Sequence, residues 1–194
     1  MSSGGLEGGP PFKYLTCARI LARVGASYIC APSDMDTRPI DSFPPGILYE
    51  MLADAYSGAP ELAGYYDNEW RDFDGFVFDN PVLLKSHGFI TTEKGEPVGF
   101  MTWDPRRLPG YVRIGHNCII AKRQGRGLGG RQLSNGLKMI GALGPKAVRV
   151  TTGNTPFFLP ARKMYESAGF ARVSVLGLED YIVSEIVEYE LSLE

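Results

Sequence analysis

The feature that most constrains this chain is a glycine-rich segment, AKRQGRGLGGRQL, at residues 121–133. Four of its thirteen residues are glycines and four are cations. Glycine takes backbone conformations that other residues avoid, and it lets a ligand approach the peptide groups closely. A bare backbone surrounded by positive charge is typical of loops that hold phosphate. The segment therefore predicts a phosphate-binding loop.

The residues on either side indicate that this loop joins a strand to a helix. The run GYVRIGHNCIIA at 110–121 has the β-rich composition of a strand. Behind the loop, Leu133, Leu137 and Ile140 recur at i, i+4 and i+7, which predicts a helix. A phosphate at the start of such a helix would meet free backbone N–H groups.

Positive charge is concentrated around the same loop. Residues 105–165 contain twelve Lys or Arg and no Asp or Glu, whereas residues 1–104 carry 15 acids and 7 bases. Residues 166–194 carry 7 acids and 1 base, so the chain has a net charge of −2. Such segregation suits an anionic partner for the middle segment. The alternative is a solvated surface with a chance excess of cations.

The composition, 44% hydrophobic and 22% charged, is that of a soluble globular protein. No run approaches the roughly 18 consecutive apolar residues of a membrane helix, and the N-terminus lacks the charge pattern of a signal peptide. We therefore expect a cytoplasmic protein with no membrane partner. Cys17, Cys30 and Cys118 are too few and too scattered for a disulfide framework or a zinc site, so we expect reduced thiols and no metal.

The chain is long enough for one domain with its own core, and its N-terminal part differs from the rest. We expect residues 1–34 to be an appendage, either flexible or upstream of the true start, and residues 35–194 to be the folded domain. The expected elements are helices at 45–57 and 61–80, a hairpin at 87–105, a strand at 110–121, a helix behind the loop, a strand at 146–152, a helix at 160–169, and strands at 171–176 and 184–193. This order predicts an α/β (α+β) fold.

Three phosphate-loop patterns can be compared with the glycine-rich segment. Gly125, Gly127 and Gly130 match the dinucleotide fingerprint, but that fingerprint needs an acidic residue about 20 positions later, and none occurs before Glu166. A Walker loop does not fit, because no Gly-Lys-Ser/Thr follows. The third pattern is Gln124-x-x-Gly127-x-Gly129, at the junction of strand and helix.

This third pattern resembles the pyrophosphate loop of the GNAT superfamily of acetyl-CoA-dependent N-acetyltransferases, Gln/Arg-x-x-Gly-x-Gly/Ala. A second block, Asn154 followed by ARKMYESAGF at 161–170, is similar to that family's Asn…Ala-x-x-x-Tyr-x-x-x-Gly-Phe. The resemblance runs from about Met35 to the C-terminus in element order. It implies a mixed, mostly antiparallel central sheet flanked by helices and splayed at the strand before the loop. Gly115, in the middle of that strand, is compatible with a bulge there.

The resemblance also implies acetyl-CoA as co-substrate, whose phosphates suit the basic segment. The main chain at Ile119 and Ala121 would contact the pantetheine arm, and the amide near Ile119 would polarise the acetyl carbonyl. The positions implied for cofactor binding are Ile119, Ile120, Ala121, Gln124, Gly125, Arg126, Gly127, Leu128, Gly129 and Asn154.

Tyr165 occupies the family position of the general acid, which protonates the leaving CoA thiolate. A phenol with an unperturbed pKa of about 10 can donate to a thiolate formed beside it. Ala161, Met164 and Ala168 share a helical face with Tyr165, so a purely structural tyrosine in the core is the alternative.

The attacking amine must lose a proton, so a base is also needed. His116, on the strand that leads to the cofactor, has a suitable unperturbed pKa, but it shares a strand face with Cys118 and equally fits a packed histidine. Asp104, in the run TWDP, is a second candidate, and its alternative is an aspartate that starts a turn before proline. Asn117 is expected to orient groups in the site.

The acceptor is expected to lie over residues 61–79, which hold six acids and six aromatic residues. Carboxylates and aromatic faces suit a cationic amine, and the alternative is an amphipathic helix with its aromatics in the core. We therefore expect an N-acetyltransferase that moves an acetyl group from acetyl-CoA to a primary amine, a small cationic one, by direct attack in a ternary complex.

Two other functions are compatible with the sequence. One is a catalytically silent protein of the same fold that binds acetyl-CoA. The other is an RNA-binding module that uses the basic segment at 105–165, which needs exposed aromatics among the cations. Only Tyr111, Phe157 and Phe158 are available there, so we expect no nucleic-acid partner. The expected assembly is a monomer or a homodimer.

Overall fold

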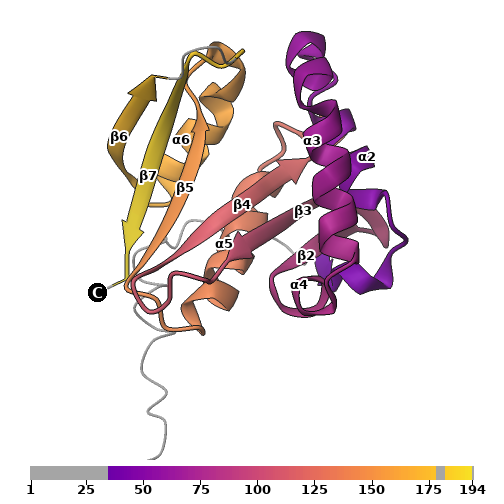
Figure 1. Cartoon of the computed structure of the whole chain (residues 1–194), viewed down its shortest axis with the longest axis horizontal. Helices are drawn as coiled ribbons and strands as arrows, with labels where there is room; N and C mark the ends of the chain where they lie inside the picture. Colours follow the sequence, from indigo (N-terminus) through magenta and orange to yellow (C-terminus); the bar gives the residue numbers. More distant parts are fainter. Residues whose placement is uncertain (1–34, 178–181, 194) are drawn as a thin grey trace, which may run out of the picture.

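The computed structural model describes residues 35–177 and 182–193. Its centre is a seven-stranded sheet in the order β1-β2-β3-β4-β5-β7-β6 (Figure 1). Neighbouring strands are antiparallel except β4 and β5, which run parallel. The strands are β1 (Met35–Arg38), β2 (Gly88–Glu93), β3 (Glu96–Asp104), β4 (Tyr111–Ile119), β5 (Ala147–Gly153), β6 (Ala171–Gly177) and β7 (Glu185–Ser192). The predicted α/β fold with a mixed, mostly antiparallel sheet is confirmed.

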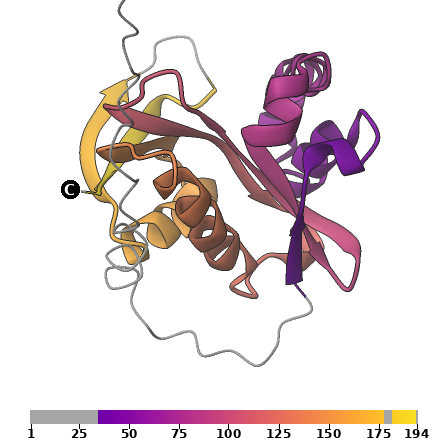
Figure 2. The ribbon, with the colours of Figure 1, turned by 90° about the horizontal axis from the view of Figure 1, so that it is seen from below.

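Helices cover both faces of the sheet (Figure 2). On one face lie α2 (Ile47–Ala55), α3 (Pro60–Phe78) and α4 (Pro81–Ser86), and on the other lie α5 (Leu128–Gly141) and α6 (Leu159–Ser167). Three short 3-10 turns connect these elements: η1 (Ile40–Ser42), η2 (Ala121–Arg123) and η3 (Pro156–Phe158). The result is three layers, with the sheet between two layers of helix.

The alternation of side chains along the strands divides the core in two. Phe89 and Met101 point to the face of α5 and α6, whereas their neighbours Ile90 and Phe100 point to the face of α2 and α3. These strands are buried along most of their length because both of their faces are covered. The apolar spacing that predicted the helix behind the loop is confirmed, since its side chains are buried in the first of these cores.

β4 and β5 separate soon after they meet. Their pairing consists of Tyr111, Val112 and Arg113 opposite residues 147–149, after which both strands continue without pairing to each other. Figure 1 shows the two strands diverging toward their carboxyl ends. The splay expected at the strand before the glycine-rich loop is therefore confirmed.

A bulge in β4 accompanies the splay. Met101 of β3 lies opposite Asn117 while Trp103 lies opposite Ile114, so β4 has one residue more than β3 over this stretch. Gly115 is within the bulge, where an added Cβ would lie 3.1 Å from Thr102 Oγ1. The same hydroxyl accepts a hydrogen bond from the His116 N–H at 3.2 Å. The bulge redirects the next residues of β4 toward the gap.

Two elements were not expected from the sequence. β1 is an edge strand of four residues without hydrophobic alternation, and α4 is a short helix that begins at Pro81. The helix behind the loop also begins earlier than its apolar period indicated: it starts at Leu128, although Gly129 and Gly130 in its first turn are poor helix formers. Tertiary contacts stabilise these segments where their own propensities do not.

Some expectations concern residues outside the described ranges. The appendage predicted at 1–34, with Cys17 and Cys30, lies there, whereas Cys118 is a buried free thiol. Within 35–177 and 182–193, no helix combines the length and apolar character that a membrane crossing requires. Over the same residues, no cluster of His, Cys, Asp or Glu is suited to hold a metal ion.

Candidate active site

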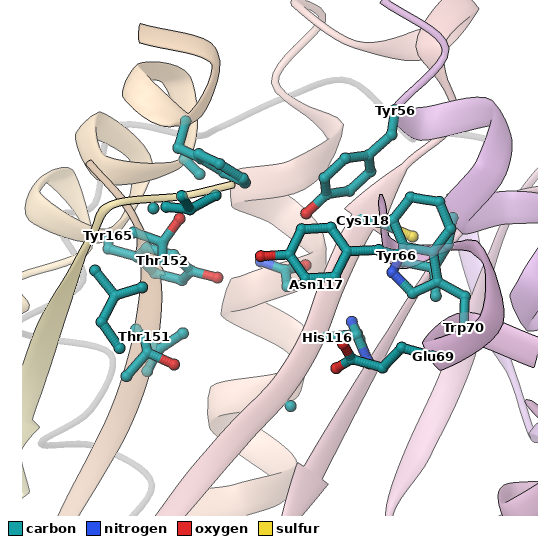
Figure 3. A pocket seen from close by; sticks show the side chains of 18 residues that line it. Tyr56, Tyr66, Glu69, Trp70, His116, Asn117, Cys118, Thr151, Thr152 and Tyr165 are labelled. Carbon is teal, nitrogen blue, oxygen red and sulfur yellow. The ribbon is translucent and has the colours of Figure 1, made fainter. Parts of the chain in front are cut away.

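A cavity of about 240 Å³ occupies the gap between β4 and β5 (Figure 3). One wall, the α6 wall, is formed by Ala161 and Tyr165 of α6 with residues 150–153 of β5. The α3 wall, across the cavity, is formed by Tyr66, Glu69 and Trp70. Residues 115–118 of β4 lie between the two walls. Leu52, Tyr56, Phe158, Val183 and Ile186 complete the lining.

Tyr165 is packed in the core and also lines the cavity. Its ring is 4% exposed and packs in the core, with centroids 5.6 Å from Phe170 and 6.2 Å from Tyr189. Burial raises the pKa of Tyr165 to about 12, and a side-chain hydrogen bond with Asn117 lowers it in part. The hydroxyl is therefore protonated at neutral pH and available as a proton donor.

Asn117 is held at the cavity wall by a buried glutamine. Gln132 of α5 is fully buried, and its Nε2 donates to Asn117 Oδ1 at 2.6 Å. Asn117 Nδ2 in turn lies 3.9 Å from the sulfur of Met164, the residue before Tyr165. The expectation that Asn117 orients groups in the site is therefore compatible with its contacts. Gln132 itself was not singled out, although a glutamine four residues after Leu128 and four before Gly136, on the buried face of a helix, was a detectable signal.

His116 lines the cavity as a neutral imidazole. Its ring centroid lies 4.4 Å from that of Phe73 and 6.1 Å from that of Phe100. Burial lowers the pKa of His116 to about 4, so the ring carries no charge at neutral pH. In the neutral ring one nitrogen carries a proton, and the other nitrogen can accept one. Figure 3 shows His116 and Glu69 directed into the same cavity.

Aromatic side chains form most of the α3 wall. Tyr66 and Trp70 are stacked with centroids 6.0 Å apart, and Tyr56 lies 4.8 Å from Trp70. Tyr56 also contacts Phe158, at 6.0 Å, which links this wall to the start of α6. Burial raises the pKa of Tyr56. The wall is therefore apolar except for the carboxylate of Glu69 and the tyrosine hydroxyls.

Two other acids of α3, Asp74 and Asp67, have structural partners. Asp74 is buried and accepts hydrogen bonds from Gly46 N–H at 2.7 Å and Leu48 N–H at 3.0 Å, which caps the N-terminus of α2. Asp67 accepts from the Tyr49 hydroxyl at 2.8 Å and pairs with Arg71 at 2.9 Å. Of the carboxylates in the described residues, Glu69 alone lines the cavity. Two of the acids in residues 61–79 therefore hold α3 against α2, and one, Glu69, faces the cavity.

The structure does not bring Asp104 to the cavity. Asp104 lies at the end of β3, and its carboxylate pairs with Arg106 at 2.6 Å. Hydrogen bonding to the Arg106 side chain lowers the pKa of Asp104. Asp104 Oδ1 also accepts from the Arg106 N–H at 2.9 Å, which is the turn-starting role weighed as the alternative for this residue.

The glycine-rich loop has the backbone that its sequence indicated. Gly125 and Gly127 have φ values of 72° and 75°, a left-handed conformation that favours glycine. Gly127 is the N-cap of α5, where no side chain caps the helix and no acid stands in the first turn. The N–H groups of Leu128, Gly129 and Gly130 in this first turn have no partner within the helix. An anion could be bound there by backbone donors and by the helix dipole.

Side chains tie this loop to α2. Gln124 Nε2 donates to the carbonyls of Ile119 at 2.9 Å and Ala55 at 3.1 Å. The Ala121 N–H donates to Asp54 Oδ1 at 2.6 Å. Gln124 therefore holds the loop in place, and the Ala121 N–H, expected to face a cofactor, is engaged by a carboxylate.

The end of β4 presents unpaired peptide groups to the gap. The Ile120 N–H donates to Val98 O at 3.0 Å, so Ile120 faces β3. Alternate residues of an antiparallel strand bond to the same side. The peptide groups of Ile119 and Asn117 therefore point away from β3, toward the gap with β5. The Ile119 carbonyl is taken by Gln124, which leaves its N–H as the donor on this side.

Asn154 and Arg126 have protein partners. Asn154 does not line the cavity; its Nδ2 donates to Glu185 Oε2 at 2.7 Å, and its N–H donates to the Glu185 carbonyl at 2.9 Å. Arg126 lies 3.3 Å from Glu93, which also pairs with Arg123 at 2.6 Å. A carboxylate of the β2–β3 hairpin thus sits beside the basic loop.

The charge that is segregated along the sequence is partly balanced in space. Arg113 pairs with Glu188 at 3.3 Å and Arg149 pairs with Glu190 at 2.7 Å, because β7 brings the C-terminal acids next to β5. Arg149 also lies over the Tyr111 ring at 4.4 Å from its centroid. These cations belong to the sheet and not to one continuous basic surface.

No family model matches this sequence, and no curated protein does. The fold, however, matches solved structures. One is a candidate acetyltransferase of the GNAT family from Desulfovibrio desulfuricans, with a TM-score of 0.67 and 18% identity over 82% of this chain and 99% of that one. Another is a GNAT-family acetyltransferase from Elizabethkingia anophelis with acetyl-CoA bound, with a TM-score of 0.59 and 15% identity over 82% of this chain and 98% of that one. The chain has the GNAT fold.

A third structure with the same arrangement is an aminoglycoside 6'-N-acetyltransferase complexed with coenzyme A, with a TM-score of 0.58 and 16% identity over 82% of this chain and 97% of that one. The GNAT fold thus spans nearly the whole length of each of these neighbours. At these identities the likeness is one of fold, and the chemistry of the chain depends on the residues of its own cavity.

Proposed function

We propose that this chain is a GNAT N-acetyltransferase that moves an acetyl group from acetyl-CoA to a small cationic primary amine. One observation carries the proposal: the cavity between β4 and β5 has a protonated tyrosine on one wall and a carboxylate among aromatic rings on the other. β4, which separates the walls, leads directly into a glycine loop and an uncapped helix N-terminus. These are the parts that a thioester, a phosphate group and an amine would each require.

Acetyl-CoA is the cofactor that this arrangement fits, as co-substrate and without a metal. Its pyrophosphate would bind the N–H groups at Leu128 and Gly129, next to the loop glycines at 125 and 127. Arg126 would contact the phosphates by exchanging Glu93 for them, since its present ion pair is exposed and weak. The side chains of Gln124 and Asn154 bind protein groups, and the Ala121 N–H binds Asp54. These groups would therefore stabilise the protein around the cofactor and not contact the cofactor themselves.

The pantetheine arm would enter the gap beside β4. The N–H groups of Asn117 and Ile119 point there, and an added strand-like segment could accept from them. The Ile119 N–H is then the donor nearest the loop, and it would polarise the acetyl carbonyl as charge develops on its oxygen. This use of unpaired peptide groups explains why a splay in the middle of a sheet is tolerated.

The reaction is direct attack of the amine nitrogen on the thioester carbonyl. A C–N bond forms and the C–S bond breaks, with the electron pair leaving on the CoA sulfur. Tyr165 supplies a proton to that sulfur from the α6 wall. The ammonium form first loses one proton to solvent, because only the neutral amine has a lone pair for the attack. Once the C–N bond has formed, the nitrogen gives up its second proton to neutral His116, which holds it weakly because the pKa of its ring is about 4, and which passes it to solvent.

The α3 wall supports a cationic acceptor. The carboxylate of Glu69 attracts an ammonium group, and the faces of Tyr66 and Trp70 add cation–π attraction. One structural neighbour is named as an aminoglycoside N-acetyltransferase, which is in line with a small amine as acceptor.

Isothermal titration with acetyl-CoA is the first test, with dephospho-CoA and NAD as controls. We expect acetyl-CoA to bind, dephospho-CoA to bind more weakly because the 3′-phosphate is missing, and NAD not to bind. Turnover is then followed over a panel of mono- and polyamines by release of free thiol. The proposal fails if acetyl-CoA does not bind.

The second candidate function is binding of acetyl-CoA without catalysis, because the glycine-rich loop could bind the cofactor whether or not the acetyl group is transferred. Binding of acetyl-CoA without thiol release for any amine on the panel would favour it. With turnover in hand, Tyr165→Phe separates the two functions: loss of turnover with retained binding supports the enzyme.

A further inference from the structure

Gln132 is a fully buried polar side chain whose hydrogen-bonding groups are all engaged. Its Nε2 donates to Asn117 Oδ1 at 2.6 Å, and also lies 2.8 Å from Phe100 O and 3.1 Å from Cys118 O. Its Oε1 accepts a hydrogen bond from the Thr91 hydroxyl at 2.6 Å. Gln132 does not line the cavity, so no substrate contact explains its presence in the core.

These contacts permit one orientation of the Gln132 amide. Turning it over would place its oxygen against the backbone oxygens of Phe100 and Cys118, which cannot donate a hydrogen bond. With the orientation of Gln132 fixed, Asn117 must present its own oxygen to Nε2. The Asn117 NH₂ group is thereby turned toward α6, where it lies 3.9 Å from Met164 Sδ, and Asn117 and Tyr165 line the same cavity.

We propose that Gln132 is a positioning residue for the acetyl transfer: by holding Asn117 Oδ1, it directs the Asn117 NH₂ group at the Tyr165 oxygen and so stabilises the phenolate left after proton donation. This inference rests on the proposed function. Thr91, Gln132, Asn117 and Tyr165 form a chain of polar groups that runs from the core of the sheet to the cavity.

The contacts from Thr91 to Tyr165 would affect the step in which the CoA thiolate leaves. When the CoA thiolate leaves, the O–H bond of Tyr165 breaks, an S–H bond forms, and the electron pair stays on the phenolic oxygen until solvent returns a proton. A phenolate is costly in these buried surroundings, since burial alone raises the pKa of Tyr165. A donor aimed at the oxygen offsets part of that cost, and Asn117 lowers the pKa in agreement with this.

The competing explanation is that Gln132 is only a structural cross-link between α5 and the sheet. Two variants distinguish these roles. Gln132→Met removes the amide and keeps a side chain of similar length. Thr91→Val is the matched control, because it removes a buried hydrogen bond to the same glutamine without touching Asn117. Both variants are made in the wild-type protein and in Tyr165→Phe.

The measurements are kcat, KM for acetyl-CoA and the melting temperature. We expect Gln132→Met to lower kcat about tenfold, the effect of one lost hydrogen bond in the transition state, and to leave KM within about twofold. Thr91→Val should lower the melting temperature and change kcat less than about twofold. In the Tyr165→Phe background, Gln132→Met should have no further effect on kcat, because the proton donor is already absent.

If Gln132→Met does not fold, Asn117→Ala at the cavity wall takes its place, with the same expected loss of kcat and the same lack of effect in Tyr165→Phe. An equal loss of kcat in Thr91→Val, or independent losses in the Tyr165→Phe background, overturns the inference and leaves the proposed function standing. Absence of turnover by the wild-type protein with every amine overturns both.

Discussion

The two walls of the cavity differ in what holds their polar groups. On the α6 wall, Tyr165 is packed among aromatic rings, and it lines the cavity with Asn117, which Gln132 holds from the core. On the α3 wall, Glu69 stands on a helix whose other acids, Asp67 and Asp74, hold it against α2. The first wall is part of the sheet core, and the second is a helical layer laid over it. We infer that the reaction chemistry is built into the core, whereas acceptor choice depends on how one helix is positioned.

The largest expected effect tests the α6 wall. Tyr165→Phe should lower kcat by about 10²–10³-fold, the usual worth of a general acid, because the thiolate leaves without a proton donor. Acetyl-CoA affinity, measured by isothermal titration, should stay the same, since the ring and its packing are retained. A variant with nearly normal kcat would remove Tyr165 from the mechanism.

The second prediction concerns Asp74, which binds α3 to the start of α2 and so holds the α3 wall in place. Asp74→Ala should lower the free energy of unfolding by about 2–3 kcal/mol, because it leaves buried N–H groups at the start of α2 without an acceptor. Urea denaturation measures the change. Asp74→Asn is the matched control and should lose less, since an amide oxygen can still accept. Equal stability of Asp74→Ala and wild type would show that the α3 wall is held by other contacts.

His116, between the walls, gives a pH dependence of stability. Its folded-state pKa of about 4 is below the unfolded value of about 6.5, so the unfolded chain binds more protons between these values. The stability that His116 contributes is thus full above about pH 6.5 and is lost as the pH falls toward 4, by about 3 kcal/mol. Urea denaturation at pH 7 and pH 4.5, compared with His116→Asn, isolates this contribution. An unchanged pH dependence in His116→Asn would mean that the imidazole is not buried neutral.

Glu69→Gln is expected to have the smallest effect and the most selective one. Loss of the carboxylate should raise KM for a cationic acceptor by about tenfold, the worth of one charged contact, and leave kcat within about twofold. Steady-state kinetics at saturating acetyl-CoA measure both constants. Asp67→Asn is the control, because that acid is on the same helix but pairs with Arg71 outside the cavity. Similar KM changes in both variants would point to a general effect of charge.

Much of the fold could be predicted because the relevant signals are local. The glycine loop, the apolar period of α5 and the β-rich runs each specify an element through its own residues. The bulge was also indicated by Gly115. β1 and α4 were not predictable in this way, since four and six residues carry no period and depend on neighbours for their stability.

The site was predictable only in part. Motif positions led to Tyr165 and the loop, but not to the partners that decide what each polar group does. Asp104 and Glu69 are both acids in the sequence, and only their places in the fold show that one binds Arg106 in a turn while the other, on α3, lines the cavity. Gln132 and Asn117 are fifteen positions apart and meet only because α5 packs back on β4.

The hydrogen bonds that Gln124 and Ala121 make to α2 connect the glycine-rich loop to the lining of the cavity. Gln124 holds the Ala55 carbonyl, and the next residue, Tyr56, is part of the cavity lining. A phosphate that displaced the loop would therefore also act on the end of α2 and on the ring of Tyr56, because these hydrogen bonds join the loop to the cavity lining.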